Sequence, residues 1–367
     1  MKKIIKRMIN RYNNFIRDIK IGQSNKLSDK KVRYLVNDTV WSTRHDGECL
    51  MKFLPNQIGK ITTSHHGIKH GILHIGGVTN ALYRKKIRWP SKEAQCGLTW
   101  FHVLDNDKRL ALVPKLDKGL AFWHTSCSST AEILIRNGAS KDKMHIIPLG
   151  VDIDIFKPIP NEEKVKFRKK IGIPDDAFVI GSFQKDSYGW DDGERPKLEK
   201  GPDIFCDVIE KLNESYNIFV LLSGPARGYV KNRLLKSEVK FYHTGYLDYA
   251  DDVAPFYNAL DLYLIASRIE GGPKAALEAP SSGIPLVTSS VGMVPDLFTH
   301  NETALISNNG DKESLHNLCE KIINDPALRN KLSIYGRKLA EKNSWSKISK
   351  RYYDELYQPI INNKKNS

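Results

Sequence analysis

The chain of 367 residues is long enough for two domains, since a single domain usually holds about 150 residues. It carries 57 Lys and Arg against 42 Asp and Glu, which gives a net charge of +15, and 40% of its residues are hydrophobic. This hydrophobic content excludes a disordered chain, and no apolar run reaches the ~18–20 residues that span a bilayer. Five scattered cysteines, an odd number, predict reduced thiols in the cytoplasm and exclude a disulfide scaffold.

Residues 1–24 predict a basic amphipathic helix. Apolar side chains recur every three or four positions from Ile5 to Ile19, and Lys or Arg fills much of the rest. Two interpretations stay open, a helix on an anionic membrane surface and an ordinary docked helix with a solvated basic face. The charge excess favours acidic partners, but the sequence shows no RNA-binding, zinc-finger or zipper motif, so we expect no nucleic acid.

Residues 25–155 predict an N-terminal Rossmann-like domain of the α/β class. Short apolar runs indicate parallel strands, and Asn137-Gly138 ends a helix over 127–137. The strands are expected at 31–36, 58–64, 71–76, 97–103, 119–125 and 144–149. Pro, Gly and Asp residues in the segment 145–160 then indicate a domain boundary.

Residues 156–345 predict a second domain with the same alternation. Its strands are expected at 178–183, 216–222, 239–243, 261–266, 285–288 and 303–306. Its helices are expected at 202–214, 228–236, 250–259 and 273–282, with long helices over 311–342. Residues 346–367 predict a final helix, crossing back to the first domain, and a polar tail. Two such sheets facing each other would hold a ligand in a cleft at the carboxyl ends of their strands.

The strongest motif is SRIEGGPKAALEAPSSGIPLV, residues 267–287. After a buried strand, a turn with Gly271 and Gly272 leads to Pro273, which is expected to open a helix. Backbone N–H groups at a helix start favour an anion, and glycines let a ligand approach the backbone. The motif therefore predicts a diphosphate site.

Two glutamates flank this helix start. Glu270 precedes it and Glu278 lies eight residues later, so the helical rise separates them by roughly 10–12 Å. That distance matches a nucleotide sugar from hexose to ribose, and each carboxylate can hold sugar hydroxyls. The alternative is a Gly-Pro turn with two solvated glutamates.

Other turns at the same sheet edge favour the same ligand. The loop 184–200 is basic and ends in Lys200 before Gly-Pro, where a lysine can meet phosphate oxygens. The segments SGPARG (223–228) and HTGYL (243–247) are further strand-to-helix turns. One such turn arises easily by chance, whereas an ordered set does not.

On these motifs, residues 145–345 resemble the family-4 retaining glycosyltransferases. The matching segments are IPLGVDIDIFKP (147–158), EKGPDIF (199–205), LLSGPARG (221–228), ALDLYLIASRIEGGPKAALEA (259–279) and SGIPLVTSSVGMVPDLF (282–298). The resemblance implies the GT-B fold, two Rossmann-like domains facing across a cleft. It also implies a nucleotide-sugar co-substrate linked to UDP or GDP, with neither a metal nor another cofactor.

The resemblance assigns roles to the matched residues. It implies that Glu270 contacts the donor sugar, that Glu278 contacts the ribose, and that Lys200 contacts the diphosphate. The family's arginine after the first strand is absent from GSFQKD, so Lys185 and Arg195 are candidates for its place. The remaining implied donor contacts are Gly224, Tyr246, Leu247, Gly271, Gly272, Pro273 and Lys274.

The first domain matches more weakly and is shorter. In place of the family's Gly-rich loop stands NDTVWSTRHDGECL (37–50), with Gly47 as its candidate counterpart. The family often places a histidine beside the donor sugar, and His102 is the preferred match for a catalytic role. His66 and His124 follow, so Gly47, His66 and His124 are the acceptor-side candidates. Each histidine has the alternative of a structural residue at a strand end.

The expected reaction moves a sugar, with retention, onto a lipid-linked glycan in cell-surface polysaccharide synthesis. The charge and the basic helix place the protein at the inner face of the cell membrane. Two alternatives stay open: another GT-B enzyme, such as an inverting transferase or a phosphorylase, and a non-catalytic module that binds nucleotide sugars.

Overall fold

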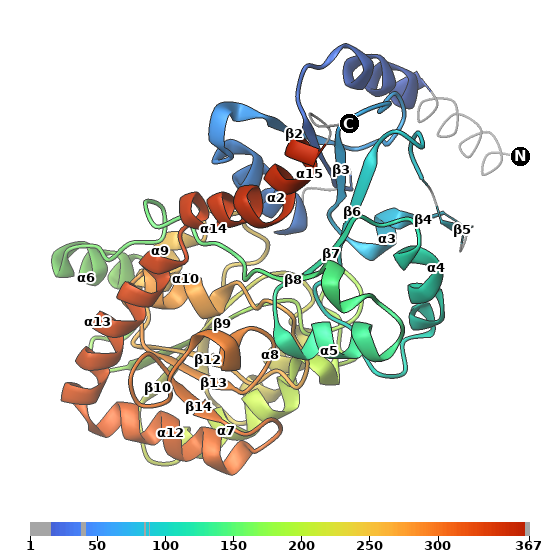
Figure 1. Ribbon diagram of the computed structural model, residues 1–367. Coiled ribbons are helices and arrows are strands. Elements are labelled where there is room, and N and C mark those ends of the chain that lie inside the picture. Colours follow the sequence, from blue (N-terminus) through green and yellow to red (C-terminus); the bar gives the residue numbers. More distant parts are fainter. Residues whose placement is uncertain (1–15, 38–41, 84–85, 88, 364–367) are drawn as a thin grey trace, which may run out of the picture. The chain divides into compact units, whose positions relative to one another are not determined.

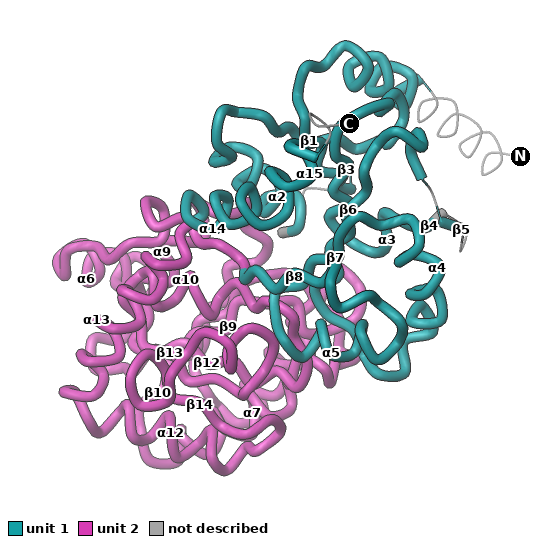
Figure 2. Tube along the Cα trace, in the orientation of Figure 1, with its two compact units in different colours: residues 1–148, 345–367 teal, residues 149–344 magenta. Residues whose placement is uncertain are grey.

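The structure is a computed structural model that describes residues 16–37, 42–83, 86–87 and 89–363. The chain divides into two compact units (Figures 1 and 2). Unit 1 holds residues 1–148 and 345–367, and unit 2 holds residues 149–344. The chain passes from unit 1 to unit 2 at 148–149, within the segment 145–160 where a boundary was expected. It returns to unit 1 at 344–345.

Unit 1 is built on a six-stranded parallel sheet in the order β2-β1-β3-β6-β7-β8. Its strands are β1 (Val32–Leu35), β2 (Gly59–Thr62), β3 (Ile72–Ile75), β6 (Gln95–Thr99), β7 (Phe122–Thr125) and β8 (Met144–Ile146). A small antiparallel pair, β4 (Leu82–Tyr83) and β5 (Lys86–Ile87), lies apart from it. β6 ends earlier than predicted, at Thr99, and the next residue donates its indole N–H to the carbonyl of His102.

Of the helices of unit 1 between β1 and β8, the sequence predicted only α5. They are α2 (Ser42–Lys52), α3 (Val78–Ala81), α4 (Val113–Asp117) and α5 (Ser128–Arg136), with 3₁₀ turns at Pro55–Gln57, Lys108–Leu112 and Lys141–Lys143. Helix α2 replaces the loop expected around Gly47, and a Cβ at Gly47 would lie 2.7 Å from the ring of Tyr34. Gly47 therefore allows α2 to pack against β1, and the loop interpretation was wrong.

Residues 16–27 are helical, which covers the last part of the predicted basic helix. Residues 1–15, which hold most of its basic side chains, lie outside the described residues. The described helix exposes Ile19 and Leu27.

The C-terminal segment returns to unit 1 as α14 (Trp345–Tyr352), a π-helical turn (Tyr353–Tyr357) and α15 (Gln358–Asn363). In an α-helix, residues five positions apart point about 140° away from each other. A π turn has hydrogen bonds between residues five apart, so it brings Tyr352 and Tyr357 to one side. Both side chains are buried there.

Unit 2 contains the second six-stranded parallel sheet, in the order β11-β10-β9-β12-β13-β14. Its strands are β9 (Phe178–Phe183), β10 (Ile218–Ser223), β11 (Lys240–His243), β12 (Leu262–Ile265), β13 (Leu286–Ser289) and β14 (Leu305–Ser307). The chain builds the sheet outward from β9 on one side and from β12 on the other. The carboxyl ends of β9 and β12 are thus the topological switch point, where open α/β sheets bind ligands.

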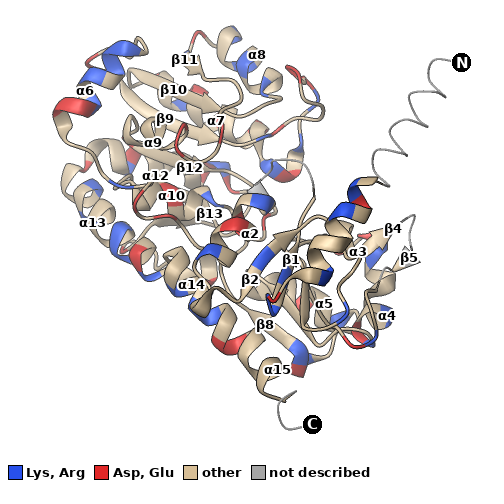
Figure 3. Ribbon diagram, turned by 90° about the horizontal axis from the view of Figure 1, so that it is seen from above, with Lys and Arg blue, Asp and Glu red and all other residues tan. Residues whose placement is uncertain are grey.

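The helices of unit 2 are α6 (Asn161–Lys170), α7 (Pro202–Asn213), α8 (Gly228–Lys236), α9 (Ala254–Asn258), α10 (Ala275–Ser281), α11 (Val294–Leu297), α12 (Lys312–Asn324) and α13 (Pro326–Lys342). A 3₁₀ turn spans Leu198–Lys200. The sequence did not predict α6, which begins with acidic residues, ends with basic ones and buries none of its side chains (Figure 3). Without a buried face, it lacks the apolar period that identifies a helix.

The core of unit 2 fixes the position of the switch point. Ile180 of β9, Val220 of β10 and Leu264 of β12 are buried in one apolar cluster. Phe205 and Ile209 of α7 belong to the same cluster. The loops that follow β9 and β12 therefore start from well-packed strands.

Candidate functional site

Two loops meet at the switch point of unit 2. The backbone N–H groups of Arg268 and Ile269, after β12, donate to the carbonyl of Glu199, after β9, at 2.9 and 3.0 Å. Gly201 has φ +61°, and a Cβ there would lie 1.9 Å from the carbonyl oxygen of Ala266. Only glycine fits this position, which brings the start of α7 against the end of β12.

The contact between these loops joins two of the predicted site residues. Nζ of Lys200 lies 2.7 Å from both carboxylate oxygens of Glu270. The hydroxyl of Ser267 donates to Glu270 at 2.9 Å, and the amide of Gln184 donates to the carbonyl of Lys200 at 3.1 Å. The Glu270 side chain is only 9% exposed, so the alternative of a solvated glutamate is wrong here.

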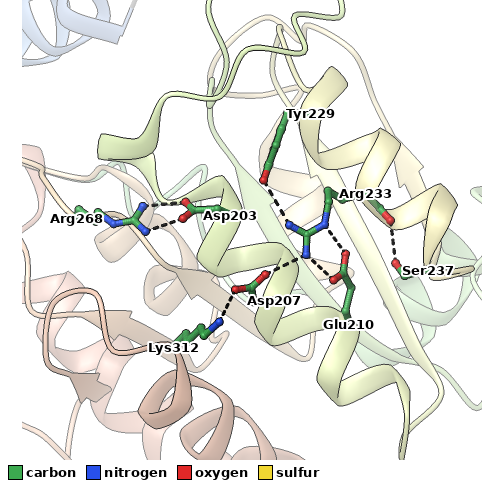
Figure 4. Close-up of polar contacts among 8 residues, drawn as sticks. All are labelled: Asp203, Asp207, Glu210, Tyr229, Arg233, Ser237, Arg268 and Lys312. Carbon is green, nitrogen blue, oxygen red and sulfur yellow. Dashed lines mark hydrogen bonds and ion pairs between the residues drawn. The ribbon is translucent and has the colours of Figure 1, made fainter.

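A charge network holds both loops on α7 (Figure 4). Arg268 makes two hydrogen bonds with Asp203, at 2.6 and 2.8 Å, and a third with the carbonyl of Leu198 at 2.7 Å. Asp207 and Glu210 lie further along α7, and Arg233 of α8 pairs with them at 2.9 and 2.5 Å. The hydrogen bond to Asp203 raises the pKa of Arg268. Arg268 thus ties the loop that carries Glu270 to the helix that follows Lys200.

Glu278 lies in the first turn of α10 and is only 4% exposed. Its carboxylate accepts hydrogen bonds from the hydroxyls of Tyr257, at 2.7 Å, and of Tyr249. Burial and the charge of Glu278 raise the pKa of Tyr257 well above its ordinary value, so this hydroxyl stays protonated and donates. Nζ of Lys274 lies 4.2 Å from the centre of the Tyr249 ring. Both predicted glutamates are therefore held by named partners.

The glycine turn before α10 packs against the connection that follows β13. The carbonyl of Gly271 accepts from the N–H of Met293 at 2.8 Å, and a Cβ at Gly292 would lie 2.2 Å from that carbonyl. Helix α10 begins at Ala275, two residues later than predicted, but the N–H of Ala276 still bonds to the carbonyl of Pro273 at 2.9 Å. The turn through Gly271, Gly272 and Pro273 is thus fixed on both sides.

The turns after β9, β10 and β11 also touch one another. Gly224 has φ +99°, its N–H donates to the carbonyl of Gly245 at 3.0 Å, and a Cβ there would lie 3.1 Å from the carbonyl of Gln184. Tyr246, next to Gly245, is exposed, and Leu247 is half-buried. The structure therefore brings the predicted turns to one edge of the sheet.

Of the two candidates for the missing arginine, Arg195 lies on a hairpin and Lys185 directly precedes it. Residues 186–197 form this hairpin, with an antiparallel bridge between Ser187 and Pro196. Nζ of Lys185 lies 4.2 Å from the centre of the Trp190 ring, and Cζ of Arg195 lies 4.9 Å from that of Tyr188. Burial and the charge of Lys197 lower the pKa of Lys185.

The sequence did not predict a role for Arg227, which directly precedes α8 and is fully buried, with its guanidinium against the end of β9. Its guanidinium donates to the carbonyls of Ser182 and Gln184, both at 2.8 Å, and lies 3.2 Å from the buried carboxylate of Asp186. The motif SGPARG contains this residue, but we interpreted the motif through its glycines. Arg227 holds the backbone from which the hairpin begins.

Comparisons with known proteins show which family this segment is similar to. Residues 194–339 match the family model of the glycosyl transferases group 1. The group 1 segment covers the positions of Lys200, Glu270 and Glu278, so the expected resemblance to glycosyltransferases is confirmed there.

Individual relatives agree with the group 1 assignment. The chain is 25% identical over 245 residues to the D-inositol 3-phosphate glycosyltransferase of Xylanimonas cellulosilytica, covering 64% of this chain and 56% of the relative. It is 24% identical over 238 residues to the capsular polysaccharide biosynthesis glycosyltransferase CapM of Staphylococcus aureus, covering 63% of this chain and 59% of the relative. The chain thus spans less than two thirds of the length of both relatives.

A solved structure confirms the fold outside the group 1 segment as well. Anabaena HepE, solved in complex with UDP and glucose, superposes with a TM-score of 0.71 at 14% identity, covering 89% of this chain and 99% of that chain. The predicted fold class, α/β with the two Rossmann-like domains of the GT-B type, is confirmed.

The histidines outside the group 1 segment occupy different environments in unit 1. His124 is fully buried: Nδ1 lies 2.8 Å from the hydroxyl of Thr99, and Nε2 lies 2.9 Å from the hydroxyl of Tyr352. Burial, together with His145 and Arg351, lowers its pKa to about 3 despite a hydrogen bond to a backbone carbonyl. A neutral histidine enclosed by the core cannot meet an acceptor, so the structural alternative replaces the acceptor-side role.

The other two histidines are exposed. His102 follows β6, and His66 stacks on His65 with ring centres 4.4 Å apart. Of the parts of the chain that the structure describes, none gathers three His, Cys, Asp or Glu side chains as metal ligands. No helix in those parts is both long and apolar enough to cross a membrane.

Proposed function

We propose that the protein is a retaining glycosyltransferase that moves a sugar from a nucleotide-sugar donor to a lipid-linked glycan. The observation that carries the proposal is the pairing of Lys200 with Glu270 at the switch point of a group 1 segment. Glu278 is held nearby in the chain, in the first turn of the helix that follows the glycine turn.

The charges of this site suit the transfer of a sugar. Breaking the bond between a sugar and a diphosphate puts negative charge on the diphosphate and positive charge on the sugar. A fixed cation and a fixed carboxylate stabilise these charges when they develop, and they require little rearrangement. In the proposed complex, Nζ of Lys200 donates to the diphosphate from its place beside Glu270, and Glu270 holds sugar hydroxyls and stabilises the positive charge.

The donor contacts follow the order of the turns along the sheet edge. Glu278 is proposed to accept from the ribose hydroxyls, and the turn with Tyr246 and Leu247 is proposed to hold the base. The glycine turn at Gly271 and Gly272 lies over the sugar. HepE was solved with UDP and glucose, which supports UDP-glucose as the first donor to test.

The acceptor proposal rests on charge and on the relatives. The net charge of +15 suits an anionic lipid pyrophosphate at a membrane surface, and CapM acts in capsular polysaccharide biosynthesis. We propose peripheral binding to the inner membrane face through the basic residues 1–20. Deleting these residues is expected to release the protein from anionic vesicles in a sedimentation assay. Continued sedimentation of the truncated protein would contradict the anchor.

The test of the reaction uses radiolabelled UDP-sugars and GDP-sugars with a membrane extract. We expect one donor to label a lipid, and we expect the product bond to keep the anomeric configuration of the donor by NMR. Labelled lipid with the opposite configuration indicates an inverting enzyme, and phosphate-dependent breakdown indicates a phosphorylase. Nucleotide-sugar binding without a labelled product indicates a binding module.

A further inference from the structure

The hairpin of residues 186–197, called the aromatic finger below, is a rigid part of unit 2. Its strands are joined by hydrogen bonds from Tyr188 N–H to the Arg195 carbonyl, at 3.0 Å, and from Lys197 N–H to the Asp186 carbonyl, at 2.8 Å. At its base, Asp186 is buried beside Arg227. The finger is therefore built as a hairpin rather than as an open loop.

The tip of the aromatic finger is fastened to α8. The N–H of Tyr229 donates to the carbonyl of Gly193 at 3.2 Å, and Lys231 pairs with Asp192 at 2.7 Å. A Cβ at Gly228 would lie 2.4 Å from the carbonyl of Asp192, so α8 and the tip are in close backbone contact. Contacts at both base and tip fix the direction of the finger.

This fixed finger presents two large rings to solvent. Tyr188 is 46% exposed and Trp190 is 63% exposed. Nζ of Lys185 lies 4.2 Å from the Trp190 ring centre, and Arg195 and Lys197 lie 4.9 and 5.4 Å from the Tyr188 ring centre. Exposed rings that are already held in place bind a partner at a low entropic cost.

We propose that the aromatic finger binds a glycan that carries an anionic substituent, such as a uronic acid. The apolar C–H faces of sugar rings stack on Trp and Tyr, and the cations around the rings attract a carboxylate or a phosphate. The exposed carboxylate of Asp191, next to Trp190, can accept hydrogen bonds from sugar hydroxyls. Rings, cations and a carboxylate in one place thus match a charged sugar chain.

The acidic residues of the finger argue against a single-stranded nucleic acid, the other polyanion that stacks on aromatic rings. A single-stranded nucleic acid carries a phosphate at every nucleotide, and it requires a continuous basic groove. Asp191, Asp192 and Glu194 interrupt the cations of the finger. The hydroxyl groups of an acidic glycan can donate hydrogen bonds to these carboxylates, so a glycan tolerates this alternation.

That the bound glycan is the acceptor of the transferred sugar rests on the proposed function. That the finger binds an anionic glycan does not. Binding is measured without a donor, by calorimetry and saturation-transfer NMR on the full chain. The probes are tetragalacturonic acid, neutral cellotetraose and octathymidylate. Trp190→Ala removes the more exposed ring, and Trp190→Phe restores an aromatic face.

A matched control comes from α13. Tyr335 is also an exposed aromatic residue, 41% exposed, with Nζ of Lys338 at 5.1 Å from its ring centre. Tyr335→Ala therefore removes a similar pair of groups outside the finger. Melting curves of both alanine variants establish that the fold is kept.

We expect tetragalacturonic acid to bind more tightly than cellotetraose, and Trp190→Ala to weaken binding about tenfold. Trp190→Phe should recover part of the affinity, and Tyr335→Ala should leave it unchanged. The proposal is overturned if neither tetrasaccharide binds at millimolar concentration, if Trp190→Ala keeps the wild-type affinity, or if octathymidylate binds more tightly. Glycan binding without sugar transfer in any assay would refute the proposed function and leave the finger proposal standing.

Discussion

The hydroxyl of Tyr357 lies 2.6 Å from Nδ1 of His74, although 283 positions of sequence separate the two residues. The other ring nitrogen of His74 lies 2.6 Å from the hydroxyl of Thr99, which in turn contacts His124 at 2.8 Å. This buried polar chain joins β3, β6 and β7 to the C-terminal π turn. The turn therefore completes the core of unit 1.

Tyr357→Phe should destabilise unit 1 by about 1–3 kcal/mol, because the buried Nδ1 of His74 loses its partner. Thermal unfolding measured by calorimetry checks this value. Tyr353→Phe is the control, since Tyr353 lies in the same turn and is only half-buried. Equal effects of both substitutions would show that the hydrogen bond to His74 contributes nothing.

Unit 1 should lose stability as the pH falls below about 6.5. Burial lowers the pKa of His124 to about 3 and that of His74 well below its ordinary value. Between about pH 3 and pH 6.5 the unfolded chain binds protons that the folded chain excludes, so stability falls with pH. The loss from His124 between pH 6.5 and pH 5 should be about 2 kcal/mol.

The measurement is the unfolding temperature of unit 1 at pH 7, 6 and 5, a range above the ordinary pKa of carboxylates. His124→Gln removes one titrating group, so its unfolding temperature should change less over the same range. A variant with the wild-type pH dependence would exclude His124 as a source of the effect.

Lys200→Met should lower the rate of sugar transfer about 100-fold, because the cation at the proposed diphosphate site is removed. Glu270 then loses its partner at 2.7 Å, so the effect on donor affinity is measured separately by calorimetry. Lys236→Met, a substitution at the last residue of α8, is the charge-matched control. Wild-type turnover in Lys200→Met would refute the diphosphate contact.

Glu278→Gln should weaken UDP binding by roughly tenfold, since a charged hydrogen-bond acceptor is replaced by a neutral one. The amide keeps the shape of the side chain beside Tyr249 and Tyr257, so the fold should be retained. Tyr257→Phe retains the carboxylate and should preserve UDP binding better. Calorimetry that gives unchanged UDP affinity for Glu278→Gln would remove the ribose assignment.

Gly201→Ala should be more harmful than Gly172→Ala, although both glycines have positive φ, +61° and +76°. At Gly172 a Cβ meets nothing within 4 Å, so the cost is the backbone strain of about 1–2 kcal/mol. At Gly201 it also meets the carbonyl of Ala266 at 1.9 Å. Calorimetry should therefore show a larger loss of stability for Gly201→Ala than for Gly172→Ala, and lost UDP binding for Gly201→Ala only; equal behaviour would contradict the close contact.

The sequence predicted the strands of both six-stranded sheets because most of them are short apolar runs between turn residues, as in β9 and β12, but it did not predict the pair β4 and β5. It also predicted the two loops that meet at Lys200 and Glu270. It could not predict α6, because that helix buries no side chain and therefore has no apolar period. Helix α2 was missed because Gly47, a weak helix former, is required there by the ring of Tyr34.

The partners of the site residues were also outside the reach of the sequence. Tyr257 of α9 and Tyr249 of the loop before it reach Glu278 of α10 only through tertiary packing, and no spacing relates them. The burial of Arg227 and of His124 likewise depends on tertiary contacts. A basic or titratable side chain next to a strand end indicates a binding site in the sequence, whether the folded protein exposes that side chain or buries it.

The return of residues 345–367 to unit 1 has a consequence for the order of events during protein synthesis. The ribosome must finish all of unit 2 before Tyr352 and Tyr357 can leave the exit tunnel and reach His124 and His74. Until then the nascent first unit keeps two histidines without these hydroxyl partners. Unit 2, which is continuous in sequence, can complete its own core earlier, so the segment made first is the last to mature.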